Sequence, residues 1–201
     1  MNPKEGPPMK RSILLSIAAT ATAAASLYSV APAQAGTSAN AQVTLESKVC
    51  NQIARIDAAL TRVEHASAMH RLDADVRAEV RANIDADQSA LADLSVQVST
   101  ADTVSEVRAI RAEVLAYRTV VYAQAVAALN AADDLAEQVD GSREDFSLDL
   151  SVLAMLDTAQ ASVDASVDGA VSLSATSGQA EVRAVQADLR AAARAYVTAV
   201  N

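Results

Sequence analysis

The sequence has very little of what builds strands, turns and disulfides. It contains one cysteine, no tryptophan, four tyrosines and one phenylalanine, and all four of its prolines precede residue 33. A single cysteine excludes an internal disulfide framework, so packing alone must hold the fold. Strands would need more aromatic and turn-forming residues than this chain offers. These shortages favour a fold made of helices.

Basic side chains are also scarce, because 16 lysines and arginines face 25 aspartates and glutamates, for a net charge of −9. Nucleic acids and anionic lipid surfaces are bound through clustered Lys and Arg that replace counterions. We therefore expect no nucleic-acid partner and no stable membrane insertion. The partner hypotheses that stay open are an unidentified protein of the cell envelope or medium and a second copy of the chain.

What the chain does contain begins with a leader, residues 9–38, "MKRSILLSIAATATAAASLYSVAPAQAGTS". Its positive start at Lys10 and Arg11 precedes an uncharged run, and Ala33 and Ala35 supply the small residues that a signal peptidase reads. We predict a signal peptide over residues 1–35, with cleavage before Gly36. The protein is then secreted or extracytoplasmic.

A transmembrane anchor is the alternative, since the uncharged run of residues 12–31 nearly reaches the ~20 residues that cross a bilayer. Its second half holds Ala, Thr and Ser instead of Leu and Ile, which favours the cleaved signal. We prefer Met9 as the translation start, because the codons for residues 4–6 can form a ribosome-binding site a short distance before it. Cleavage leaves 13 basic and 24 acidic side chains, a net charge of −11.

Beyond the leader, apolar residues recur with helical spacing. The first stripe has steps of 4-3-4-3 and comprises Val49, Ile53, Ile56, Leu60 and Val63, the pattern of a helix that packs on another helix. Thr103 and Glu106 form a capping-box signature at the start of a later helix. We predict a flexible tail over 36–44 and a single helical domain over 45–201, with helices at about 45–69, 73–98, 103–139, 145–173 and 179–200.

This spacing predicts an all-α fold, an elongated, coiled-coil-like antiparallel bundle of about five helices with a long central one. Short loops make consecutive helices antiparallel neighbours. The first two helices should pack on the N-terminal half of the third and the last two on its C-terminal half. A compact four- or five-helix bundle is the alternative.

Three segments, 50–60, 103–135 and 156–173, resemble a group of exported, alanine-rich helical proteins from high-GC actinobacteria. The resemblance covers nearly all of the chain beyond the leader, through heptad-like motifs of moderate specificity. It implies a compartment and a helical fold, and no activity or catalytic residue. Proteins of this group often have a proline soon after the segment equivalent to Tyr117 and Arg118. None occurs here, which leaves open whether the third helix breaks.

The sequence shows no catalytic or metal-binding pattern. His65 and His70 are five residues apart and point away from each other on a helix, which suits surface positions better than a zinc pair. The chain has no Gly-rich phosphate loop, no nucleophile elbow, and no complete calcium loop at its Asp-Ala-Asp segments. We therefore expect no enzyme and no cofactor.

The most informative polar pattern is a basic stripe on the third helix, where Arg108, Arg111, Arg118 and Tyr122 fall on one face. Asp87 occupies a core position on the preceding helix, opposite about residue 115. An unpaired buried carboxylate is costly, so we expect a structural ion pair from Asp87 to Arg111 or Arg118. An anion or carboxylate ligand held by the arginines and Tyr122 is the alternative.

Cys50 follows Val49 at the edge of the first apolar stripe. A free cysteine often behaves as a small buried hydrophobe, and an intermolecular disulfide is the alternative in an oxidising compartment.

These observations favour a structural or protein-interaction role. The alternative function is a carrier that holds an apolar or anionic small ligand between its helices.

Overall fold

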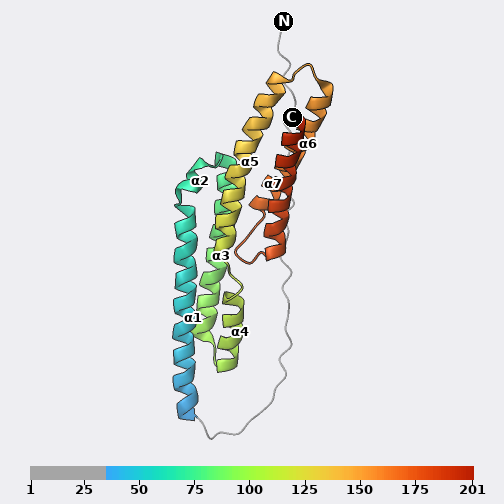
Figure 1. Cartoon of the computed structure of the whole chain (residues 1–201). Helices are drawn as coiled ribbons and strands as arrows, with labels where there is room; N and C mark the ends of the chain where they lie inside the picture. Colours follow the sequence, from blue (N-terminus) through green and yellow to red (C-terminus); the bar gives the residue numbers. More distant parts are fainter. Residues whose placement is uncertain (1–34) are drawn as a thin grey trace, which may run out of the picture. The chain divides into compact units, whose positions relative to one another are not determined.

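The computed structural model describes residues 35–201, and this part of the chain forms seven α-helices and no strands (Figure 1). The predicted all-α fold is confirmed. The predicted leader, with Met9 and Ala33, lies outside the described residues, whereas Ala35 and Gly36 are the first residues of α1. The helices are α1 (Ala35–Glu64), α2 (Ser67–Arg71), α3 (Ala74–Thr100), α4 (Val104–Val114), α5 (Val120–Asp145), α6 (Leu150–Val171) and α7 (Gln179–Val200).

The N-terminal end of α1 replaces the predicted flexible tail, which is a correction. Residues 36–44 are helical, and they contact the rest of the fold through Gln42, whose side-chain amide donates to the Ala101 carbonyl at 3.0 Å. The hydrogen bond from Gln42 satisfies a carbonyl at the C-terminal end of α3. The last four carbonyls of any α-helix lack partners within the helix. At its other end α1 stops at Glu64, five residues earlier than predicted, and the short α2 follows.

The helices pack in two groups that meet along α5 (Figure 1). One group contains α1, α3 and α4, and the other contains α6 and α7, which pack on each other and on α5. Val49 and Leu60 of the predicted first stripe, together with Val107 of α4, form part of the core of the first group. Leu156, Ala159 and Val163 fill the second. The predicted pairing of helices with the two halves of residues 103–139 is confirmed.

The predicted third helix at about 103–139, whose continuity the sequence left open, breaks between α4 and α5. Residues 115–119 contain neither proline nor glycine, so their local sequence does not call for a break. The cause is a tertiary contact: the backbone N–H of Arg118 donates to the Ala175 carbonyl in the α6–α7 loop at 2.6 Å. In a continuous helix that N–H would bond within the helix.

The turn between α5 and α6 also differs from the prediction. The Asp140-Gly141 pair does not end the helix, and α5 continues to Asp145. The next helix begins at Leu150 after Asp149, whose Oδ1 accepts hydrogen bonds from the backbone N–H groups of Ser151 and Val152. This is N-capping by a carboxylate, a common helix start.

Gly141 offers a direct test of helix propensity, because a Cβ added there would meet nothing within 4 Å. We expect Gly141→Ala to raise the free energy of unfolding by about 0.5–1 kcal/mol, since alanine loses less backbone entropy in a helix. Urea unfolding followed by circular dichroism measures the change. The same substitution at Gly169 should give less, because its Cβ would lie 3.0 Å from Val185 Cγ2 on α7. A lower stability for Gly141→Ala would contradict the helical assignment at this position.

Candidate functional sites

A buried carboxylate lies where the two groups of helices meet. Asp87 on α3 is 8% exposed, and its Oδ2 accepts a hydrogen bond from the Tyr122 hydroxyl at 2.7 Å and from the Ala175 backbone N–H at 2.7 Å. Tyr122 is 1% exposed and Ala175 is fully buried. We call these three residues the Asp87 junction. Burial, together with the hydrogen bond to Asp87, raises the pKa of Tyr122 well above its usual value of 10.0.

The junction is extended by a second polar contact from α3. The Asn83 side-chain amide donates to the Val171 carbonyl at the end of α6, at 2.6 Å. Together with Asp87, it bonds α3 to the end of α6 and to the middle of the α6–α7 loop, and Arg118 bonds the α4–α5 segment to the same loop. Each of these contacts satisfies a backbone group that would otherwise be costly to bury. The junction therefore has the features of a structural joint between packed helices.

The predicted ion pair is wrong: within the described residues, Asp87 pairs with Tyr122 and the Ala175 N–H, and no salt bridge joins it to Arg111 or Arg118. Arg118 is exposed, and only its backbone takes part in the junction. The break after α4 is the physical reason, since it turns α5 and carries Tyr122 to Asp87. The four residues of the predicted stripe therefore separate into different surroundings.

Arg108 and Arg111 instead line a groove between α1 and α4. Lys48 and Leu45 of α1 line the same groove, with Val104 at the start of α4. Among the described residues, none of these three cations forms a salt bridge. We call this the α1–α4 groove. It is a local basic surface, lined also by the apolar side chains of Leu45 and Val104, in a protein whose net charge is −9.

A second unusual surface is the turn between α5 and α6, residues 144–150, which we call the hairpin tip. Its apolar side chains are exposed: Leu148 to 97%, Leu150 to 82% and Phe146 to 36%. Glu144, Asp145 and Asp149 are exposed in the same turn. The hydrogen bond from the Ser151 hydroxyl lowers the pKa of Asp149 below its usual value.

The hairpin tip corrects the predicted helix at about 145–173, which would include Leu148. Helix α6 begins later, at Leu150, so Leu148 lies outside it. The signal that could have located the tip is Asp149 followed by Ser151, an N-cap pattern.

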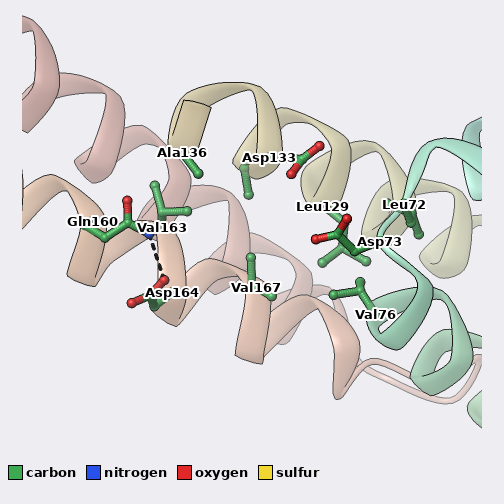
Figure 2. Close-up of a pocket in the computed structure, with 11 residues that line it drawn as sticks. Leu72, Asp73, Val76, Leu129, Asp133, Ala136, Gln160, Val163, Asp164 and Val167 are labelled. Carbon is green, nitrogen blue, oxygen red and sulfur yellow. Dashed lines mark hydrogen bonds between the residues drawn. The ribbon is translucent and has the colours of Figure 1, made fainter. Parts of the chain in front are cut away.

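Figure 2 shows a cavity of about 140 Å³ between the start of α3, α5 and α6. Four polar residues line it: Asp73, Asp133, Gln160 and Asp164. The Gln160 side-chain N–H donates to Asp164 Oδ1 at 3.0 Å, and its Oε1 turns away from Asp164 (Figure 2). That oxygen is buried and has no hydrogen-bond partner within the described part of the chain. The apolar wall comprises Leu72, Val76, Leu129, Ala132, Val163 and Val167.

The other residues that the sequence singled out, His65, His70 and Cys50, lie outside the sites described above. His65 and His70 are exposed, as predicted. Cys50 is half-buried and free within the structure, beside a shallow groove between α1 and α3, and an intermolecular disulfide stays a prediction. In residues 35–201 no group of three or more His, Cys, Asp or Glu side chains is placed to hold a metal ion.

Comparison of the chain with protein-family models, with curated proteins and with solved structures finds no match. The resemblance to exported actinobacterial proteins therefore stays a prediction. Among the described helices, none is both long and apolar enough to cross a membrane.

Proposed function

We propose that this chain is an exported, non-catalytic structural protein that assembles head to tail with copies of itself. In this proposal the hairpin tip of one copy binds the α1–α4 groove of the next. The observation that carries it is the exposure of Leu148 and Leu150, at 97% and 82%, in a turn that also holds three exposed carboxylates. Large apolar side chains that gather on a surface commonly mark an interaction site.

Charge complementarity argues for a second copy as the partner. The tip offers the carboxylates Glu144, Asp145 and Asp149, and the groove offers Lys48, Arg108 and Arg111. Apolar side chains accompany both sets, so a single contact would bury leucines while it pairs opposite charges. Anionic lipid headgroups would repel the same carboxylates, which makes a membrane surface a poorer partner for the tip.

The contact joins two different surfaces, so it is heterologous. Such contacts build rings when the rotation closes and open chains when it does not. The negative net charge opposes approach at low ionic strength. At about 0.15 M salt the Debye length is ~8 Å, so long-range repulsion is screened while close pairs persist.

Two variants that each lack one surface test the assembly. Leu148→Ser with Leu150→Ser removes the tip, and Arg108→Glu with Arg111→Glu reverses the groove. We expect the unmodified protein to form larger species as its concentration rises in sedimentation velocity runs, whereas each variant stays monomeric. An equimolar mixture of the two variants should form a dimer that does not grow further, because only one intact tip and one intact groove can meet.

Two controls separate this assembly from other associations. Val197→Ser changes a 53% exposed valine on α7, outside both surfaces, and should assemble like the unmodified protein. Reductant in all samples removes any disulfide through Cys50. Monomeric behaviour of the unmodified protein up to about 1 mM, a concentration at which even weak contacts are populated, would refute the proposal. So would failure of the two variants to combine.

A further inference from the structure

Local sequence and tertiary structure disagree at the break between α4 and α5, residues 115–119, which we call the elbow (Figure 1). The elbow contains neither proline nor glycine, the residues that most often interrupt a helix. A conflict between local preference and the fold is expected chiefly at functional or strained positions. The elbow is therefore a candidate for a part of the fold that moves.

The buried residues of α4 and α5 keep one helical register across the elbow. Steps of three and four residues connect them without a gap: Val107, Ile110, Val114, Tyr117, Val121, Ala125, Ala128, Ala132, Leu135 and Val139. All of them are buried except Tyr117, which is half-buried. A continuous helix through the elbow would therefore carry this whole stripe on one face.

Backbone hydrogen bonds show how the chain leaves the helix at the elbow. The N–H groups of Ala116 and Tyr117 donate to the carbonyls three residues back, at 3.0 and 3.3 Å, instead of four residues back. The N–H of Arg118 leaves the helix altogether and donates to the Ala175 carbonyl at 2.6 Å. One bond to the α6–α7 loop thus takes the place of a bond within the helix.

Ala175 links the elbow to α3, because both sides of this fully buried residue are bonded. Its carbonyl accepts from Arg118, and its N–H donates to Asp87 Oδ2 at 2.7 Å. Asn83 of α3 also holds the end of α6, through the Val171 carbonyl at 2.6 Å. The contacts that fix the loop on α3 are therefore the contacts that present the Ala175 carbonyl to the elbow.

We propose that the elbow is a two-state hinge controlled by the α6–α7 loop. In the bent state, which the structure shows, α3 holds the loop and the loop holds Arg118. In the straight state the loop is released and α4 and α5 join into one helix. The Arg118 N–H has a partner in both states, since in a straight helix it donates to the Val114 carbonyl four residues back. Packed elements with two such discrete arrangements switch between them instead of deforming gradually.

The hinge uses residues outside the hairpin tip and the α1–α4 groove, so it does not depend on the head-to-tail assembly. What it predicts is a coupling: any change that frees the α6–α7 loop should extend the helix through residues 115–119. A rigid elbow would instead stay bent, or lose its order, when the loop is freed.

Backbone NMR of the protein tests this coupling, because Cα chemical shifts report helical geometry at each residue. Asn83→Ala loosens the loop, and we expect the Cα resonances of residues 115–119 to move together toward helical values. Asp87→Ala, which removes the acceptor of the Ala175 N–H, should move them further in the same direction. Tyr122→Phe is the matched control, because it removes the other hydrogen bond to Asp87 and keeps the one from Ala175. Its elbow resonances should stay in place.

Glycine substitutions give a second test. In the Asn83→Ala background, Ala116→Gly should lower the ratio of straight to bent state about fivefold, because only the straight state places residue 116 inside a helix. Ala112→Gly, at an exposed position of α4 that is helical in both states, should leave the ratio unchanged. The proposal is overturned if Asn83→Ala leaves the elbow resonances where they are in the unmodified protein. It is equally overturned if Tyr122→Phe moves them as much as Asn83→Ala does, or if the two glycine substitutions act alike.

Discussion

Asp87→Ala is expected to lower the free energy of unfolding by about 3–5 kcal/mol, because two buried donors lose their acceptor at ~1–3 kcal/mol each and a small cavity is added. The donors are the Tyr122 hydroxyl and the Ala175 N–H, both bonded to the same oxygen of Asp87 at 2.7 Å. This loss is a large share of the 5–15 kcal/mol that typical domains possess. Urea unfolding at neutral pH measures it.

Three further variants show which property of Asp87 matters. Asp87→Asn keeps an acceptor oxygen for both donors and should cost less than half as much as alanine. Asp85→Ala, two residues earlier and exposed, should change stability by less than about 0.5 kcal/mol. Arg118→Met distinguishes the junction from the ion pair that the sequence predicted. Only the backbone of Arg118 bonds in the structure, so methionine should be nearly neutral.

The opposite ranking of the stability losses in these variants would contradict the role that we assign to the Asp87 junction. If Arg118→Met were as damaging as Asp87→Ala, the arginine side chain would be the partner of the carboxylate after all. If Asp87→Ala were neutral, the carboxylate would not hold α3 against the α6–α7 loop.

Helix content and the pairing of helices could be predicted because they depend on local spacing. The 4-3 stripe through Val49 packs against the core, and the capping box at Thr103 and Glu106 is present with both reciprocal hydrogen bonds. The last helix, at residues 179–200, begins and ends as predicted. In each case a pattern within a few residues determines the structure.

The resemblance left a break after α4 open, but the residues at the break do not predict it, because its cause lies nearly sixty residues away. Nothing in residues 115–119 disfavours a helix, whereas the Ala175 carbonyl captures the Arg118 N–H. A helical projection carried across the break placed Tyr122 among arginines, and the structure buries it against Asp87 instead. The prediction that Asp87 needs a partner was sound in its physics, since a buried carboxylate must be satisfied. The sequence alone could not identify that partner as Tyr122, because the two residues meet only through a tertiary contact.

The candidate binding surfaces were missed for a related reason. Leu148 fits a helical stripe as well as Leu156 does, and only the position of the Asp149 cap shows that one is exposed and the other buried. The cavity is lined by three separate segments, residues 72–76, 129–136 and 160–167, so no short motif marks it. Lys48 and Arg111 are likewise distant in sequence and meet only because α1 packs on α4.

Alkaline pH should destabilise the protein through Tyr122. In the unfolded chain this phenol loses its proton near its usual pKa of 10.0, whereas in the folded protein burial and Asp87 hold the pKa well above that value. Above pH 10 the folded state therefore binds one more proton than the unfolded state. The free energy of unfolding then falls by about 1.4 kcal/mol per pH unit, and the contribution is fully present below pH 10.

The Tyr122→Phe variant isolates the contribution of Tyr122 to the pH dependence of stability, because phenylalanine has no hydroxyl to ionise. The variant should be less stable than the unmodified protein at pH 8, by about 1.5–3 kcal/mol for a lost hydrogen bond to a charged acceptor. Between pH 10 and 11.5 its stability should decline less steeply, so the two curves converge. Tyr117, whose pKa is also raised by burial and by Asp87, is present in both proteins and cancels in the difference. Urea unfolding at half-unit pH steps gives both curves. Parallel curves above pH 10 would mean that Tyr122 ionises equally in both states, which a phenol bonded to a buried carboxylate cannot do.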